Sequence, residues 1–155
     1  MSIHTTAIID SKAELAADVT VGPFCVIKGK VRIDSGTVIE SHASIGHERG
    51  IVEIGKNNHI HQGAMVGGSP QDLGYKNEET KLTVGDGNTI REYVTLNLGT
   101  TKQNGVTIVG NNNLLMAYVH LGHDCHIHDN VVMANACQVA GHVTIENNSV
   151  IGGNV

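Results

Sequence analysis

The sequence has no tryptophan, one phenylalanine and three tyrosines among 155 residues, so aromatic side chains cannot supply its core. It contains only 2 prolines but 19 glycines. Valine, isoleucine, leucine and alanine must therefore fill the interior. This composition favours many short strands joined by tight turns, because Gly, Asn and Asp tolerate the positive φ angles that such turns require.

Other absences exclude whole classes of protein. No stretch approaches the ~18 apolar residues of a membrane span, and the start, MSIHTTAIID, lacks the basic and apolar regions of a signal peptide. Three cysteines without a CxxC spacing favour a reducing cytoplasm over a disulfide scaffold. The net charge of −5, with both signs interspersed, argues against nucleic-acid binding. We therefore expect a cytoplasmic protein without an integral membrane segment.

An aliphatic residue recurs every six positions over most of the chain, with breaks after 45, 66 and 96. These positions are Ile3, Ile9, Leu15, Val21, Ile27, Ile33, Ile39, Ile45, Ile54, Ile60, Val66, Val84, Ile90, Leu96, Val109, Leu115, Leu121, Ile127, Met133, Val139, Ile145 and Ile151. A small or β-branched residue usually follows four places later. A period of six fits neither a helix nor a simple alternating strand, but it fits a short strand plus a tight turn.

Three such units would close a triangular coil of about 18 residues, and successive coils would stack at ~4.8 Å. The sequence therefore predicts an all-β protein, a parallel β-helix that forms one domain over residues 1–155. In this register Cys25, Cys125 and Cys137 fall on the small inward position. We interpret them as buried thiols that act as small hydrophobic side chains.

Two excursions interrupt the repeat, and we expect them to leave the solenoid as loops at about 67–82 and 97–108. Loops on a rigid scaffold often carry function. The first holds Gln71 and Asp72, whereas the second can be interpreted as a plain surface loop. The segment 47–50 is a shorter insertion, interpreted as a turn.

The sequence stops at Val155 inside a repeat. Because the end coil of a solenoid needs a cap, we expect the chain to be a truncated part of a longer protein, or to be closed by a partner or a short tail.

Five of the ten histidines lie between positions 120 and 142, namely His120, His123, His126, His128 and His142. With three repeats in each coil, Asp124 would lie directly below His142, and His123 below Gly141. His120 would be adjacent. The prediction is a cluster on one outward ridge of the solenoid.

Three interpretations of this cluster compete. The histidines could be solvated turn residues, which is the interpretation favoured for His126 and His128. They could bind zinc: β-helical carbonic anhydrases use two histidines five apart, as His123 and His128 are, but no third histidine lies near Gly87, where it is needed. Finally, His123 could act as a general base, since Asp124 follows it and can fix its tautomer.

Several motifs occur in an order that resembles one family. They are Pro70-Gln-Asp-Leu73, Thr83-Val-Gly-Asp-Gly-Asn88, Ile90-Arg-Glu92, Asn113-Leu-Leu-Met116, His120-Leu-Gly-His-Asp-Cys125 and Val139-Ala-Gly-His-Val143. Together they resemble the N-terminal portion of the acyl-[acyl-carrier-protein]–UDP-N-acetylglucosamine O-acyltransferases of lipid A synthesis, a hexapeptide-repeat family. The resemblance implies a left-handed sense for the β-helix.

It also implies a reaction, transfer of an (R)-3-hydroxyacyl group from acyl carrier protein to the 3-position of UDP-N-acetylglucosamine. His123 would be the general base, Asp124 would orient it, and the N–H of Gly141 would stabilise the oxyanion. By the same resemblance, the residues that contact substrate would be Gln71, Asp72, His120 and His142. No cofactor or metal is implied. The family forms homotrimers with active sites between subunits.

Two departures from the family concern the acceptor. Gly74 stands where the family usually has Lys after Gln-Asp-Leu, although Lys76 follows two places later, and Asn97 stands where the family often has His. These changes leave open an acceptor with a 3-amino group. The alternatives are a zinc-dependent enzyme similar to β-helical carbonic anhydrases and an inactive truncated solenoid fragment.

Overall fold

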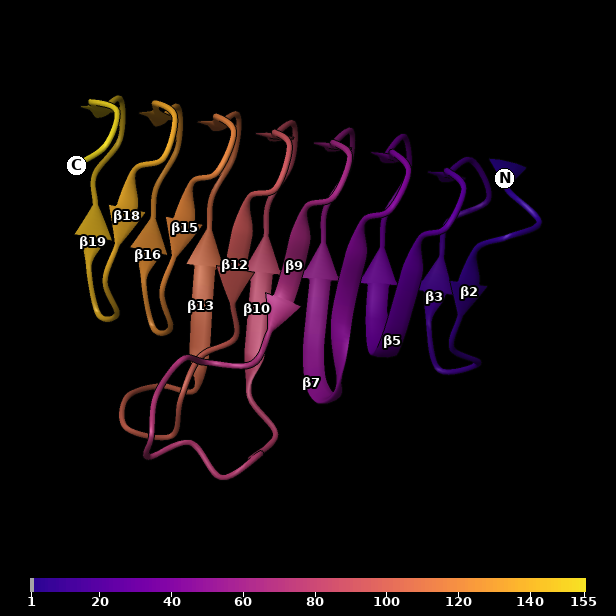
Figure 1. Cartoon of the computed structure of the whole chain (residues 1–155), viewed down its shortest axis with the longest axis horizontal. Helices are drawn as coiled ribbons and strands as arrows, with labels where there is room; N and C mark the ends of the chain where they lie inside the picture. The colour runs from indigo at the N-terminus through magenta and orange to yellow at the C-terminus, as the bar shows by residue number, and fades with distance from the viewer. Residues whose placement is uncertain (1) are drawn as a thin grey trace.

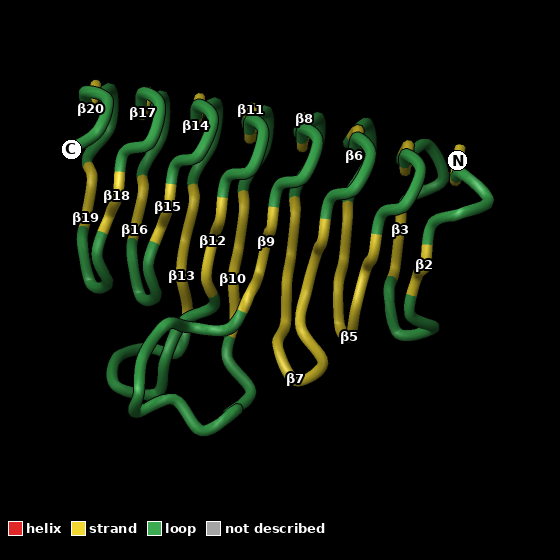
Figure 2. Tube along the Cα trace, viewed as in Figure 1, coloured by secondary structure: helices red, strands yellow, loops and turns green. Residues whose placement is uncertain are grey.

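The computed structural model describes residues 2–155, which form a stack of parallel strands without any helix (Figure 1). The chain winds from one end of the stack to the other, and each coil adds a strand to each of three faces (Figure 2). Nothing in residues 2–155 forms a helix long and apolar enough to cross a membrane. The architecture is the parallel β-solenoid that the six-residue period predicts.

One face is an eight-stranded parallel sheet made of two-residue strands. In spatial order they are β1 (Ser2–Ile3), β4 (Thr20–Val21), β6 (Val38–Ile39), β8 (His59–Ile60), β11 (Thr89–Ile90), β14 (Leu114–Leu115), β17 (Val132–Met133) and β20 (Val150–Ile151). Ile3 pairs with Val21 and Val21 with Ile39, so each of these coils consists of three six-residue repeats.

The other two faces join into one twelve-stranded sheet, because β5 (Val26–Ile33) and β7 (Ser44–Ile54) bend from one face onto the next. The strands on the first of these faces are β2 (Ile8–Ile9), β9 (Met65–Gly68), β12 (Thr95–Asn97), β15 (His120–Leu121) and β18 (Gln138–Val139). Those on the second are β3 (Glu14–Leu15), β10 (Lys81–Val84), β13 (Val106–Val109), β16 (His126–Ile127) and β19 (Thr144–Ile145).

The aliphatic positions of the repeat form the core. From Val21 to Ile145 every one of them is at most 8% exposed. The three cysteines are buried among them, as predicted, and burial raises the pKa of each thiol. They therefore pack as small apolar groups rather than as reactive thiolates.

Three asparagines replace small residues at the inward position of successive coils. The Asn88 N–H donates to Asn58 Oδ1 at 2.9 Å, and the Asn113 N–H donates to Asn88 Oδ1 at 2.9 Å. Asn113 Oδ1 in turn accepts from the N–H of Val131 at 2.7 Å. This ladder satisfies buried backbone donors and fixes the register of the coils that carry the loops.

All extra residues are inserted at one corner of the prism. Ile39 pairs with Ile60, Ile60 with Ile90, and Ile90 with Leu115, so all three of these coils are longer than three repeats, and the middle one is the longest. The additions lie within β7, between β9 and β10, and between β12 and β13. In Figure 1 the two long loops project from this edge below β10 and β13.

The loops are slightly shorter than the sequence suggests. The first spans 69–80, because β9 extends through Gly68 and β10 begins at Lys81, and the second spans 98–105. The insertion at 47–50 is not a separate turn, because it lies inside β7. Gly46, at a φ of 87°, bends the strand around the corner there.

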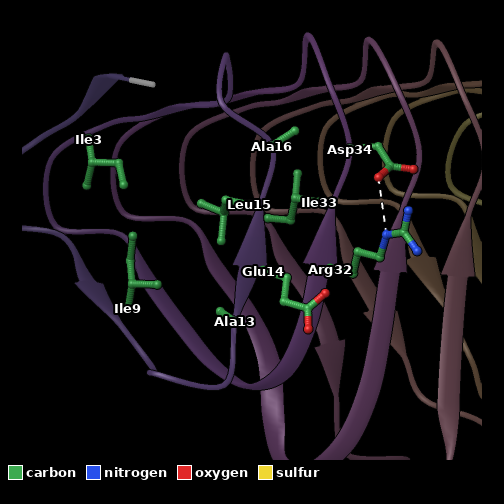
Figure 3. A pocket seen from close by; sticks show the side chains of 9 residues that line it. All are labelled: Ile3, Ile9, Ala13, Glu14, Leu15, Ala16, Arg32, Ile33 and Asp34. Atoms are coloured by element: carbon green, nitrogen blue, oxygen red, sulfur yellow. Dashed lines mark hydrogen bonds and ion pairs between the residues drawn. The ribbon is translucent and has the colours of Figure 1, made fainter.

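A hollow marks the end of the prism near the N-terminus (Figure 3). Ile3, Ile9 and Leu15 line it, and the Arg32–Asp34 ion pair, 3.2 Å between Nε and Oδ1, lies at its edge. These apolar residues occupy core positions that neighbouring coils cover elsewhere in the solenoid. The hollow holds no histidine and is separate from the histidine cluster.

Candidate active site

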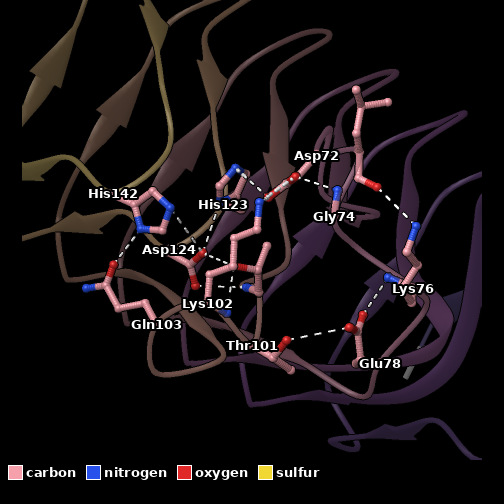
Figure 4. A network of polar contacts seen from close by, with 12 residues as sticks. Asp72, Gly74, Lys76, Glu78, Thr101, Lys102, Gln103, His123, Asp124 and His142 are labelled. Carbon is pink, nitrogen blue, oxygen red and sulfur yellow. Dashed lines mark hydrogen bonds and ion pairs between the residues drawn. The ribbon is translucent and has the colours of Figure 1, made fainter.

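The turns that carry the histidine cluster lie along the same corner of the prism as the two inserted loops. His123 and Asp124 lie in the turn between β15 and β16, and Gly141 and His142 in the turn between β18 and β19. Both loops fold against these turns (Figure 4). Consecutive coils thus contribute to one edge of the prism.

The stacking of coils made of three repeats places His123 under Gly141 and Asp124 under His142. The His142 N–H donates to the carbonyl of His123 at 3.0 Å, and the two imidazole rings meet edge to face with centroids 4.9 Å apart. A Cβ at position 141 would lie 2.6 Å from Cε1 of His123. Glycine is therefore required for the ring to pack against this backbone.

Asp124 is buried, not exposed on the ridge as the sequence suggested, with only 1% of its side chain accessible. The second loop covers it: Thr100 donates its N–H to Oδ1 at 2.8 Å and its hydroxyl to Oδ2 at 2.5 Å. Burial alone would raise the pKa of Asp124, but the hydrogen bonds from Thr100 and His123 outweigh it and lower the pKa. The carboxylate stays ionised at neutral pH.

His123 is oriented by this carboxylate through a contact of 2.9 Å between Nδ1 and Asp124 Oδ2. Because an ionised carboxylate only accepts hydrogen bonds, Nδ1 must carry the proton. In the neutral ring Nε2 is then free to accept one. Nε2 faces the first loop, 3.9 Å from Asp72 Oδ2.

Asp72 is held by a cation from the second loop. Lys102 Nζ lies 2.8 and 2.5 Å from its two oxygens, and the N–H of Gly74 donates to Oδ1 at 2.7 Å. The hydrogen bond from Lys102, followed by that from Gly74, lowers the pKa of Asp72. A Cβ on Gly74 would fall 2.8 Å from Cε and Nζ of Lys102. The ammonium group thus occupies the space beside a residue that has no side chain.

Lys76 points elsewhere: its Nζ donates to the carbonyl of Leu73 at 3.3 Å. The cation at Asp72 is therefore Lys102 rather than Lys76. The second loop also reaches His142, whose Nδ1 lies 2.5 Å from Gln103 Oε1.

Two other residues singled out from the sequence lie outside this network. His120 is on β15, where its Nδ1 lies 2.7 Å from the Thr95 hydroxyl, and burial lowers its pKa. Gln71 is exposed on the first loop. The structure therefore brings together His123, Asp124, Gly141, His142 and Asp72, with His120 and Gln71 nearby on their own elements.

The zinc interpretation required His123 to act with His128. His128 instead stacks on His126, with ring centroids 4.0 Å apart, and its Nε2 lies 3.7 Å from Glu146. Within residues 2–155, the groups that could share an ion with His123 are Asp124 and His142. Asp124 already accepts hydrogen bonds from the N–H and hydroxyl of Thr100 and from His123. These three bonds take most of the about four lone-pair sites of a carboxylate.

Thr100, Lys102 and Gln103 contact the site but were not singled out from the sequence. All three lie on the second loop, which could be interpreted there as a plain surface loop. The sequence does indicate where the second loop lies, because the number of residues in each coil places both loops at the corner that carries His123. That count gives the position of a loop, but not the direction in which it folds.

The chain matches one family of hexapeptide-repeat proteins and is similar to several acyltransferases. Residues 106–141 match the family described as bacterial transferase hexapeptide (six repeats), which together with the fold makes this a hexapeptide-repeat β-helix protein. The chain is 46% identical over 144 residues to an acyl-[acyl-carrier-protein]–UDP-N-acetylglucosamine O-acyltransferase of Thermodesulfovibrio yellowstonii, covering 93% of this chain and 55% of that protein. It is 52% identical over 133 residues to the enzyme of the same name from Saccharophagus degradans, covering 86% of this chain and 50% of that protein.

The solved structure of LpxA from Acinetobacter baumannii superposes with a TM-score of 0.95 and 47% identity, covering 98% of this chain and 58% of that one. The chain is therefore a homologue of the UDP-N-acetylglucosamine acyltransferases, matching their N-terminal portion. It shares their left-handed β-helix. The chain spans about half the length of the curated relatives it matches.

Proposed function

We propose that this chain carries the acid–base centre of an acyltransferase that moves an (R)-3-hydroxyacyl group from acyl carrier protein to UDP-N-acetylglucosamine, the first step of lipid A synthesis. The observation that carries the proposal is the 2.9 Å contact between His123 Nδ1 and Asp124 Oδ2. It leaves Nε2 as a base that faces Asp72 of the first loop. The names of the similar proteins support the choice of donor and acceptor.

In the proposed reaction, Nε2 of His123 removes the proton from the 3-hydroxyl of the sugar as that oxygen attacks the thioester carbonyl. Asp124 stabilises the imidazolium that forms. The tetrahedral intermediate then collapses, the carrier thiolate leaves, and the imidazolium returns the proton to its sulfur. The products are the 3-O-acyl sugar nucleotide and the free carrier thiol.

Gly141 is proposed as the donor to the oxyanion. Its N–H has no hydrogen-bond acceptor within residues 2–155, and a Cβ on this residue would meet the ring of His123 at 2.6 Å. A single donor of this kind is often worth ~10²–10³ in rate.

The remaining residues are proposed to contact substrate: Asp72 and Gln71 from the first loop, His142 from the corner, and His120 from β15. The contacts between Lys102 and Asp72 support this role, because they hold the carboxylate in one position. We further propose that the chain acts as a homotrimer, so that His120, which lies outside the network of one subunit, completes the site of another. An acceptor with a 3-amino group remains an alternative, since Asn97 is buried and its Oδ1 has no partner within residues 2–155.

The test replaces the base. His123→Ala should lower the rate of acyl transfer ~10²–10⁴-fold, measured with hydroxyacyl carrier protein and radiolabelled UDP-N-acetylglucosamine. His128→Ala is the matched control, because its imidazole lies one strand further on, where it stacks on His126 and approaches Glu146. Unchanged transfer in His123→Ala, or no transfer by the unsubstituted chain, would overturn the proposal.

A further inference from the structure

A second group of histidines and a carboxylate lies on the regular eight-stranded face, away from the loops. Glu40 follows β6, while His59 and His61 flank the inward Ile60 on and after β8. Because side chains alternate along a strand, both imidazoles point outward on the same side. The coils of β6 and β8 are neighbours in the stack (Figure 2).

The backbone fixes this arrangement. The N–H of Glu40 donates to the carbonyl of Ile60 at 2.8 Å, and the N–H of His61 donates to Ile90 at 2.8 Å. Glu40 Oε1 lies 2.7 Å from Nε2 of His59 and 3.4 Å from Nδ1 of His61. All three donor atoms lie within 4.8 Å of one another.

We propose that Glu40, His59 and His61 bind a zinc ion that links the coils of β6 and β8. Two imidazoles and one carboxylate form a set of ligands that zinc accepts in proteins. Because the bonds from zinc to these atoms are about 2.0–2.2 Å long, the ligand atoms of a tetrahedral site lie about 3.4 Å from one another. The distance between His61 Nδ1 and Glu40 Oε1 already has this value. The fourth position is open to water.

Accessibility and charge agree with this assignment. The side chains of His59 and Glu40 are 44% and 39% exposed, so an ion can enter. Glu92 approaches His61 at 3.8 Å, but Arg91 holds it through contacts of 3.0 and 3.1 Å, so it neutralises that cation instead of acting as a ligand.

The same chain contains a natural control. His126 and His128 flank Ile127 with the same two-residue spacing and the same 4.0 Å ring stacking. Their only nearby carboxylate within residues 2–155, Glu146, lies 3.7 Å from His128 and is 77% exposed. Within the described residues, His126 and His128 do not form part of a group of three possible ligands. The carboxylate of Glu40 from the adjacent coil is therefore what distinguishes His59 and His61 from this second pair.

The experiment titrates chelator-treated protein with ZnCl₂ by isothermal calorimetry and follows the thermal unfolding midpoint. We expect one zinc per chain and a midpoint that rises with zinc concentration, because the ion binds only the folded state. His61→Gln and Glu40→Gln should abolish both effects, with circular dichroism confirming that the variants fold. His128→Gln should bind as the unsubstituted chain does.

Three results would overturn the proposal. One is the absence of zinc binding by the unsubstituted chain, and another is equal binding by His61→Gln. The third is loss of zinc in His142→Gln with retention in His61→Gln, which would assign the ion to the His123 cluster. None of these measurements depends on acyl transfer.

Discussion

Residues 2–155 hold two groups in which a carboxylate lies between imidazoles, and the carboxylates differ in what else surrounds them. The side chain of Asp124 is 1% exposed and accepts two hydrogen bonds from Thr100 in addition to that from His123. Glu40 is 39% exposed, and His59 is the side chain that bonds to it. The first carboxylate is therefore fixed, whereas the second is free to move toward an ion.

This difference originates in the inserted loops. The corner that carries His123 receives loop 98–105, which supplies N–H and O–H donors to Asp124, while the face that carries His59 receives no insertion. On the two proposals made above, the same types of residue act as a polarised base in one place and as a set of zinc ligands in the other. Backbone and hydroxyl donors around the carboxylate decide between the two.

After removal of His123 itself, the largest effect should come from disturbing the packing of its ring. Gly141→Ala would place a methyl group 2.6 Å from the His123 ring, and a displacement of this kind can cost about 10²-fold in rate. Overpacking should also destabilise the fold by about 1–3 kcal/mol. Acyl-transfer kinetics and urea unfolding measure the two losses.

Gly152→Ala is the control, because its Cβ would meet only Val155, at an ordinary 3.5 Å. Zinc binding at Glu40 should survive both substitutions. An unchanged rate of acyl transfer in Gly141→Ala would mean that the position of the His123 ring is not critical. The difference between the Asp124 and Glu40 groups would then not explain catalysis.

A smaller effect tests the cover over Asp124. Thr100→Val removes the hydroxyl that bonds to Oδ2 and keeps the shape of the side chain. Because the pKa of Asp124 is lowered in the folded state, its ionisation stabilises the protein above the unfolded value of about 3.9. This contribution is lost as pH falls through the lower, folded pKa. The variant should therefore be less stable by about 1.5 kcal/mol at pH 7, with a deficit that shrinks below about pH 4.

Urea unfolding at a series of pH values measures this deficit. Thr101→Val is the matched control, since its hydroxyl contacts only exposed Glu78 at 3.5 Å. A deficit that stays constant from pH 7 to pH 3 would contradict the assigned role of the ionised carboxylate.

The sequence predicts the solenoid well, because burial must repeat with a period of six and leaves a visible pattern. It also predicts that positions 123 and 141 stack, since that follows from three repeats in each coil. It does not predict the contacts of Thr100 or Lys102. Their loops have no period, and their direction depends on hydrogen bonds to Asp124 and Asp72, which lie 24 and 30 positions away in the sequence. For the same reason the burial of Asp124 was missed.

The smallest effect concerns the origin of the cation at Asp72. Lys102 is 54% exposed, and an exposed ion pair is worth up to about 1 kcal/mol, so Lys102→Ala should raise the KM for the sugar nucleotide about fivefold with little change in kcat. The space beside Gly74 that Lys102 fills would then be empty.

Adding Gly74→Lys to the Lys102→Ala variant should therefore restore the KM. The same Gly74→Lys substitution in the unsubstituted chain should not improve the KM, because two ammonium groups would compete for one carboxylate. An unchanged KM in Lys102→Ala, or a double variant no better than the single one, would show that the second loop does not supply the charge at this site.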